Sequence, residues 1–146
     1  MASFDTKFFE SLIDQLSNDI GNAHSARVVI PVSHIYLEFM MRLILEKRLS
    51  KEEFENLDKD WNFGFKKKLD KLNSMGEFSD DEYYDLDIIN WIRNQLTHNF
   101  KADLFDIHDK VLSLHFHKFN KNRNPVEVVL YDVLELMQKL EQKYLN

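Results

Sequence analysis

The chain has 146 residues, of which 44% are hydrophobic and 30% charged, and its formal net charge is −6 at neutral pH. This length fits one domain with its own core, the acidic balance argues against broad non-specific nucleic-acid binding, and the lack of cysteine excludes disulfides. Because no secretory signal and no apolar run of roughly 20 residues is visible, we expect a cytoplasmic protein with no membrane contact.

Two helices are predicted in the first third of the chain. Apolar side chains three and four positions apart predict an amphipathic helix over residues 4–20. A second helix is predicted from about Ser25 or Pro31 to Arg48. Its centre is apolar almost all round, which predicts a place in the middle of a bundle or against a second chain.

Three polar side chains form a stripe on this second helix. His34, Glu38 and Arg42 are spaced four apart and therefore lie on one side. Internal hydrogen bonds or ion pairs are favoured over a ligand site as the explanation for this stripe.

The next segment is predicted to be a charged connector followed by a third helix. Residues 50–60 are rich in charge and are consistent with a connector that includes a short helical turn. Asn62 is the predicted N-cap of a helix over residues 63–75, and Gly76 is predicted to end that helix.

A fourth helix is predicted to begin at a capping box formed by Ser79 and Glu82 and to run to about His98. Its apolar positions fall on one stripe that should face the core: Ile88, Ile89, Ile92 and Leu96. The opposite face is polar, with Arg93 on its flank, and consists of Asp87, Asn90, Asn94, Thr97 and His98. Short amides, a hydroxyl and an imidazole favour a helix contact or a small polar site over a solvated face.

The remaining chain completes an all-α prediction. A weak alternation of apolar residues is consistent with a small β-hairpin between residues 108 and 120. Asn124 and Pro125 predict the start of a last helix that continues to about Tyr144. We therefore expect one domain, residues 1–146, built as a bundle of about four long antiparallel helices plus a shorter one.

The end of the fourth helix carries the residues most suited to chemistry. Arg93 offers a planar, permanently charged fork that matches a pair of phosphate oxygens. The negative end of the helix dipole favours the protonated form of His98, and an imidazole can act as general acid or base. The two side chains project about 140° apart, so that two copies across a dimer axis would be needed for one site. Alternatively, Arg93 pairs with a nearby acid and His98 only closes the helix.

The stretch from Ile88 to His98 resembles the R-N-x-x-x-H signature of the HEPN superfamily. Residues 63–76 are similar to the helix and turn before that signature in mannitol-repressor-like (MltR-like) bacterial HEPN groups, and the resemblance covers roughly residues 25–145. It implies a HEPN-like homodimer with Arg93 and His98 as the catalytic pair and Asn94 in support. The implied reaction is metal-independent endoribonuclease cleavage without a cofactor, in which the ribose 2′-hydroxyl attacks the adjacent phosphate of an RNA substrate.

The same resemblance leaves other functions open. The MltR-like branch keeps this stretch while being described as transcriptional regulators, which favours a non-enzymatic regulator or protein-interaction module as the alternative. The ribonuclease hypothesis includes toxin, phage-defence and RNA-processing roles, with an antitoxin or regulatory protein as partner. A third hypothesis is an inert relative of a toxin, bound to a nucleotidyltransferase partner.

Basic and histidine-rich positions outside this helix offer weaker candidates. Lys118, Lys121 and Arg123 are predicted either to guide RNA toward the site or to lie on a charged surface loop. Lys66-Lys67-Lys68 is predicted to be a solvated helix face. His115 and His117 have the spacing of one side of a strand, but solvent-exposed histidines are favoured there over a metal site, and no metal is expected.

Overall fold

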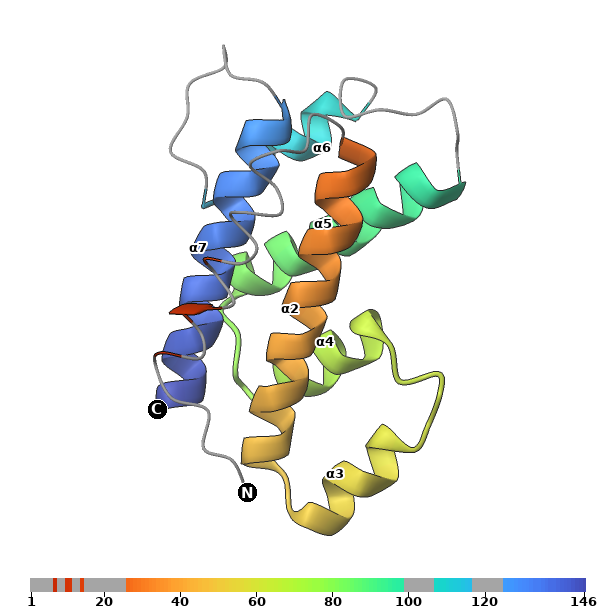
Figure 1. Ribbon diagram of the computed structural model, residues 1–146, viewed down its shortest axis with the longest axis vertical. Coiled ribbons are helices and arrows are strands. Elements are labelled where there is room, and N and C mark those ends of the chain that lie inside the picture. The colour runs from red at the N-terminus through yellow and green to blue at the C-terminus, as the bar shows by residue number, and fades with distance from the viewer. Residues whose placement is uncertain (1–6, 8–9, 12–13, 15–25, 99–106, 117–124) are drawn as a thin grey trace.

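The computed structural model in Figure 1 describes residues 7, 10–11, 14, 26–98, 107–116 and 125–146. In this part of the chain the structure is all-α, as predicted, and contains no strand. The helices follow in the order α2 (Ala26–Arg48), α3 (Lys51–Asp58), α4 (Phe65–Ser74), α5 (Asp80–His98), α6 (His108–Leu112) and α7 (Pro125–Leu145). Of the helix predicted over residues 4–20, the described residues are helical and exposed: Lys7, Glu10, Ser11 and Asp14.

Helix α2 is the central element of the bundle, as its apolar composition predicts. It packs most extensively against α7 and also contacts α4 and α5, which crosses behind it in Figure 1. Its fully buried side chains include Leu37, Met40, Met41 and Ile44. Because α2 presents apolar groups on several sides, only a position among several helices removes most of them from water.

Among the described helices, α2 alone is long and apolar enough to cross a membrane by length and composition. The stretch Val28–Arg48 has a mean hydropathy of 1.6, and 56% of its most apolar window is buried inside the fold. The packing of α2 between other helices accounts for this composition without a bilayer.

The two longest helices run parallel to each other, whereas an antiparallel arrangement was predicted. Their C-terminal ends meet, with the Lys47 ammonium of α2 lying 4.7 Å from the centre of the Tyr144 ring of α7. Figure 1 shows both helices descending in the same direction. A parallel pair needs a long return connection, and the helices between residues 49 and 124 provide it.

The charged connector contains a true helix, α3, because its N-terminus is capped. The Ser50 hydroxyl accepts a hydrogen bond from the Glu53 backbone at 3.1 Å, and the Glu53 carboxylate accepts one from the Ser50 backbone at 3.4 Å. Phe54 is buried against the core and anchors the helix. A capping box and one buried aromatic side chain thus stabilise a helix of eight residues where a connector with a short helical turn was predicted.

Helix α4 begins two residues later than predicted. Its N-cap is Gly64, and the first helical hydrogen bond runs from the Lys68 backbone to the Gly64 carbonyl at 3.0 Å. The Asn62 backbone instead donates to the Asp60 carboxylate at 2.9 Å, so Asn62 belongs to the preceding turn. The predicted stop at Gly76 is confirmed by its φ of +77°, a conformation that glycine adopts without strain.

Helix α5 follows its prediction closely. The Ser79 hydroxyl accepts from the Glu82 backbone at 3.2 Å and the Glu82 carboxylate accepts from the Ser79 backbone at 2.8 Å, which confirms the capping box. The predicted core stripe of α5 is buried: Ile88, Ile89, Ile92 and Leu96. Because this stripe faces the core, the polar side chains on the opposite face of α5 point away from the core.

The predicted hairpin is wrong where the structure describes it. Residues 108–112 form the short helix α6, whose backbone bonds include Val111 to the Ile107 carbonyl at 3.1 Å. Val111 and Leu114 are both buried, and their spacing of three matches one turn of a helix rather than one face of a strand. Residues 117–120 and the predicted cap at Asn124 lie outside the described residues.

Candidate functional site

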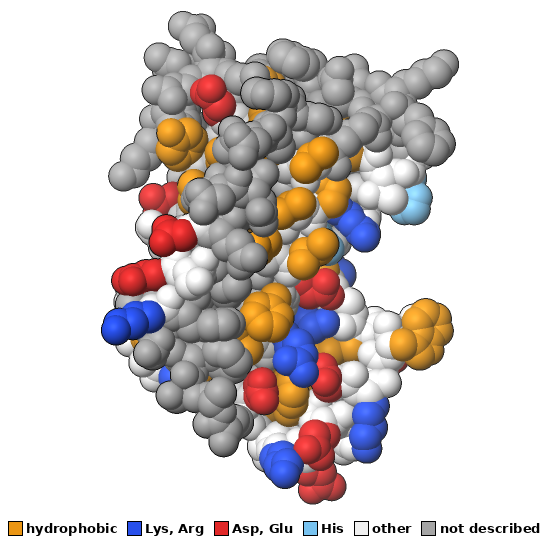
Figure 2. Space-filling view, in the orientation of Figure 1, with side chains coloured by type: hydrophobic (Ala, Val, Ile, Leu, Met, Phe, Trp, Pro, Cys, Tyr) orange, Lys and Arg blue, Asp and Glu red, His pale blue; other side chains and the backbone are white. Residues whose placement is uncertain are grey.

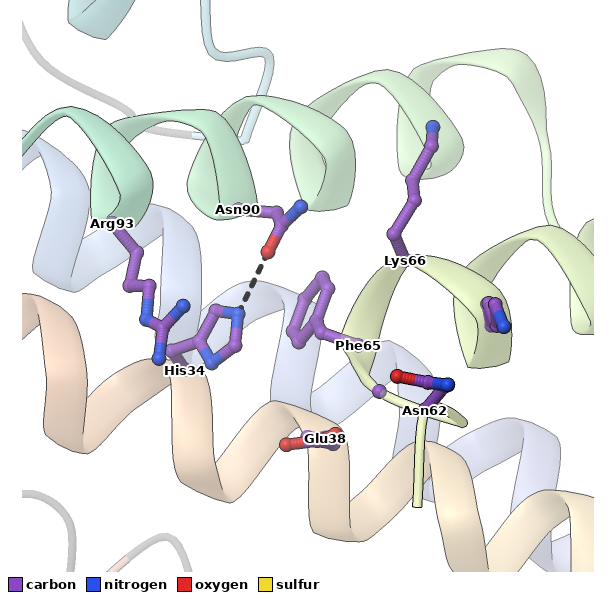
Figure 3. A pocket seen from close by; sticks show the side chains of 9 residues that line it. His34, Glu38, Asn62, Phe65, Lys66, Asn90 and Arg93 are labelled. Atoms are coloured by element: carbon purple, nitrogen blue, oxygen red, sulfur yellow. Dashed lines mark hydrogen bonds between the residues drawn. The ribbon is translucent and has the colours of Figure 1, made fainter. Parts of the chain in front are cut away.

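A polar pocket lies where α2, α4 and α5 meet (Figure 3). Its volume is about 460 Å³, a size typical of small-molecule sites. Its walls include side chains from all three helices: His34, Glu38, Phe65, Lys66, Asn90 and Arg93.

His34 is held in this pocket by contacts from the two other helices. Its Nε2 atom lies 2.9 Å from the Asn90 Oδ1 atom of α5, and its ring stacks on the Phe65 ring of α4 with centroids 4.1 Å apart. Because the amide oxygen can only accept, the hydrogen of the neutral ring belongs on Nε2. The Nδ1 atom then keeps its lone pair, and the ring orientation is set by three elements.

The pKa of His34 is lowered from its ordinary value of 6.5, chiefly because burial disfavours the charged ring. The positive charge of Arg93 lowers it further, while the hydrogen bond to Asn90 and the charge of Glu38 act in the opposite direction. His34 is therefore neutral at physiological pH. A neutral imidazole with a defined tautomer can accept a proton from a group that enters the pocket.

Arg93 contributes an uncompensated positive charge to the pocket wall. Its Nη1 atom donates to Asn94 Oδ1 at 3.2 Å, and in the part of the chain that the structure describes it has no carboxylate partner. The prediction that Arg93 pairs with a neighbouring acid is therefore not met by any described residue. In Figure 3 its guanidinium lies beside the His34 ring.

The lysines at the pocket are engaged to different degrees. The Lys66 ammonium lies 2.8 Å from a carboxylate oxygen of Asp87, whereas the Lys67 ammonium lies 3.9 Å from one of Asp60. All three lysines were predicted to be solvated. Lys68 is instead buried, and it pairs with Glu38. Its position on the inner side of α4 is the reason, since residues 66, 67 and 68 point in different directions around a helix.

Within one chain the structure brings together Arg93 and Asn94 but not His98. His98 is exposed at the last residue of α5 and does not line the pocket that Arg93 lines. The separation agrees with the angle of about 140° expected from helical geometry. A site that combines Arg93 and His98 across a dimer axis stays a prediction.

The stripe of polar residues on α2 is bonded internally, as predicted. His34 bonds to Asn90, Glu38 lies 3.2 Å from the Lys68 ammonium, and Arg42 donates to Asp58 at 3.1 and 3.0 Å. The first two of these side chains also line the pocket, which sequence reasoning missed. The signal available in the sequence was His34, the only histidine of this largely apolar helix, but its partner Asn90 is 56 positions away.

A second polar cluster is buried between α5, α7 and the turn after α6. The Asp85 carboxylate accepts the backbone N–H of His115 at 2.9 Å and lies 2.6 Å from His115 Nδ1. The Asp132 carboxylate accepts the backbone N–H of Phe116 at 3.0 Å. His115 is exposed, as predicted, and is in addition held by the Asp85 carboxylate. No group of three metal-binding side chains occurs among the described residues.

The two carboxylates of this cluster are fully buried and close enough to affect each other. Burial and the neighbouring Asp85 raise the pKa of Asp132 to about 9, although the Phe116 N–H acts in the opposite direction. Among the described residues the Asp132 Oδ2 atom has no hydrogen-bond partner, so no donor stabilises a negative charge on it. Since the pair is sealed from solvent, we interpret the cluster as a structural clamp rather than a catalytic site.

Three of the most exposed hydrophobic side chains of the described residues are on α2 and in the turn before α4. Ile35 is 63% exposed and Val28 is 48% exposed on α2, and Trp61, next to the pocket residue Asn62, is 90% exposed. Figure 2 shows hydrophobic side chains gathered along α2 on the face in view. We call Val28, Ile35 and Trp61 the hydrophobic rim. The predicted RNA-binding residues Lys118, Lys121 and Arg123 lie outside the described residues, as does His117.

No protein-family model and no curated protein sequence matches the chain. A solved structure does match: MtlR in the X-ray structure of the MtlR–HPr complex from Escherichia coli, with a TM-score of 0.68. The two chains are 14% identical, and the match covers 90% of this chain and 99% of that chain. The chain therefore has the fold of MtlR, in agreement with the MltR-like character expected from its sequence.

Proposed function

We propose that this chain is a regulatory module that acts by binding a partner protein, and that the partner is HPr or an HPr-like protein. The observation that carries the proposal is the match to MtlR over 99% of that chain, in a structure where MtlR is bound to HPr. The proposal includes a homodimer located in the cytoplasm.

The hydrophobic rim supports a binding role. Trp61 is almost fully exposed, and large hydrophobic side chains in water favour burial against a partner. Tryptophan is also enriched among the residues that contribute most to protein interfaces. Val28 and Ile35 are two helical turns apart and therefore lie on the same side of α2. Exposed apolar side chains of this kind are what a partner protein buries at the centre of an interface.

Binding of the HPr protein from this chain's own organism should depend on the hydrophobic rim. Ile35→Asp and Trp61→Ala are each expected to weaken binding at least about tenfold, because central anchors contribute about 2 kcal/mol or more. Isothermal titration calorimetry with purified HPr measures this. Leu145→Ala, which truncates an exposed hydrophobic side chain on α7, is the matched control and should bind like the wild type. A wild-type protein that does not bind HPr would contradict the choice of partner.

A second function is supported by the R-N-x-x-x-H stretch and by the Arg93–Asn94 contact. In a HEPN-type endoribonuclease, Arg93 would stabilise the charge on the phosphorane and His98 would transfer the proton of the attacking 2′-hydroxyl. Asn94 would hold the guanidinium in place. Since Arg93 and His98 are apart within one chain, this function requires His98 from a partner copy.

Cleavage of labelled RNA in the presence of a chelator tests the second function. Arg93→Ala and His98→Ala are each expected to lower the rate by at least about 100-fold, because acid–base and charge-stabilising groups contribute this much. A mixture of the two variants should recover part of the activity, since a mixed dimer contains one intact composite site. Intact RNA with the wild type, or equal cleavage by all three proteins, would reject the ribonuclease hypothesis in favour of the binding module.

A further inference from the structure

The pocket between α2, α4 and α5 is locally basic although the whole chain is acidic. Its lining carries three cations, Lys66, Lys67 and Arg93, against one carboxylate, Glu38, in a protein of net charge −6. That carboxylate is already paired with Lys68 at 3.2 Å. Lys66 is likewise paired, at 2.8 Å from Asp87 and 3.4 Å from Asp70. The positive charge that remains in the pocket lining is therefore that of Arg93, with Lys67 only weakly paired.

The individual groups match an oxyanion in kind and in number. Arg93 presents a planar fork of N–H donors whose only bond to a described residue is to the Asn94 side chain at 3.2 Å. The Lys67 ammonium lies as far as 3.9 Å from the Asp60 carboxylate, so this ion pair is weak. The Asn90 side chain, already bonded to His34, completes the wall between these cations.

His34 adds a group whose charge can respond to the anion. The ring is neutral when the pocket holds no anion, because burial and Arg93 lower its pKa. A bound anion beside the ring would favour the protonated form, so that Nδ1 becomes a donor. The other charged groups around the ring are Glu38 from α2, Lys66 and Lys67 from α4, and Arg93 from α5. Glutamate, lysine and arginine ordinarily titrate outside the range of pH 5.5 to 7.5.

We propose that this pocket binds the phosphate group of a small molecule through Arg93, with Lys67 adding positive charge to the pocket lining, and that His34 takes up a proton when the phosphate binds. The volume of about 460 Å³ leaves room for a phosphate and a short organic part. The site lies within one chain and does not include His98. It shares Arg93 with the proposed ribonuclease site but not His98, so His98→Ala should leave anion binding unchanged.

Titration with sulfate tests the anion site. Sulfate keeps a charge of −2 between pH 5.5 and pH 7.5, so any dependence of binding on pH comes from the protein. Nuclear magnetic resonance signals of the His34 ring and the Arg93 side chain should shift in a saturable manner. The pKa of His34 should rise on saturation, and binding should be at least about threefold tighter at pH 5.5 than at pH 7.5, the equivalent of half a pKa unit. Glycerol 3-phosphate should compete with sulfate, and glycerol should not.

Variants separate this site from general charge effects. Arg93→Gln is expected to weaken sulfate binding at least about tenfold, since the charged donor is lost. Lys51→Gln removes the same charge from an exposed position on α3 and should change binding less than about twofold. His34→Gln should abolish the dependence on pH. The proposal is overturned if the wild-type signals do not move, if glycerol 3-phosphate fails to compete, or if Arg93→Gln binds like the wild type. HPr binding is measured separately, so either result can stand without the other.

Discussion

Asp85→Ala is expected to lower the free energy of unfolding by about 3 kcal/mol or more, the cost typical of breaking a buried charged contact. The Asp85 carboxylate is fully buried and accepts the backbone N–H of His115 at 2.9 Å. It also lies 2.6 Å from His115 Nδ1. Without it, the His115 backbone donor loses its partner, and a cavity remains between α5 and the turn after α6. Urea unfolding followed by circular dichroism measures the effect.

Asp81→Ala is the matched control for this prediction. Its carboxylate also contacts His115, at 3.3 Å from Nε2, but it is mostly exposed to solvent. An exposed ion pair contributes at most about 1 kcal/mol, so Asp81→Ala should unfold close to the wild type. If the two variants were equally stable, the assignment of Asp85 as part of a structural clamp would be wrong.

Asp132→Asn is expected to be more stable than the wild type at pH 8, and its advantage should shrink as the pH falls toward 5. In the folded wild type, burial and the nearby Asp85 raise the pKa of Asp132 from its ordinary value of 3.8 to about 9. Between these two values the folded protein holds a proton that the unfolded chain has released. Folding then requires uptake of a proton, and wild-type stability must fall as the pH rises through this window.

The asparagine variant removes this dependence and keeps the hydrogen bond from the Phe116 backbone, because its amide oxygen can accept that N–H. We expect the stability difference between the two proteins to change by at least about 1.4 kcal/mol between pH 8 and pH 5, which is the value of one pKa unit. Glu135, which also raises the pKa of Asp132, is present in both proteins and does not affect the comparison.

Urea unfolding at several pH values measures this difference. Asp109→Asn neutralises an exposed carboxylate on α6 and serves as the control, and its stability profile should run parallel to that of the wild type. If the profile of Asp132→Asn also ran parallel, Asp132 would not hold a proton in the folded protein.

The buried clamp and the polar pocket differ in their exposure to solvent and therefore in their expected roles. The clamp of Asp85 and Asp132 is sealed between α5, α7 and the turn after α6, and its expected effects are on stability. The pocket that contains His34 and Arg93 is open to solvent, and its expected effects are on binding. Variants of the clamp should thus be examined at a temperature where they remain folded before binding is measured.

Local features of the fold were predictable from the sequence. The capping box of Ser79 and Glu82, the stop at Gly76 and the buried stripe of α5 all depend on residues within a few positions of each other. Hydrophobic periodicity and cap chemistry act over one or two helical turns, so a sequence displays them directly. The apolar composition of α2 similarly predicted its central place in the bundle.

Errors arose where a local pattern had two outcomes that only packing could separate. The weak alternation after residue 107 was consistent with a hairpin, but burial of Val111 and Leu114 against the core favours the turn of α6. His115 is exposed, as expected, but its carboxylate partner Asp85 was missed because it is 30 positions away in the sequence. Such contacts form only when α5 and the segment after α6 are brought together.

By itself, the sequence determined an all-α domain, the positions of most of its helices and the presence of Arg93, Asn94 and His98 at the end of one of them. The tertiary structure alone decided that Arg93 shares a pocket with His34, and that His98 lies outside it. The physical reason is that a helix fixes the angles between its own side chains, whereas the partner of each side chain comes from elements distant in the sequence. The bond between His34 and Asn90 joins residues 56 positions apart, and it exists because α2 and α5 cross there.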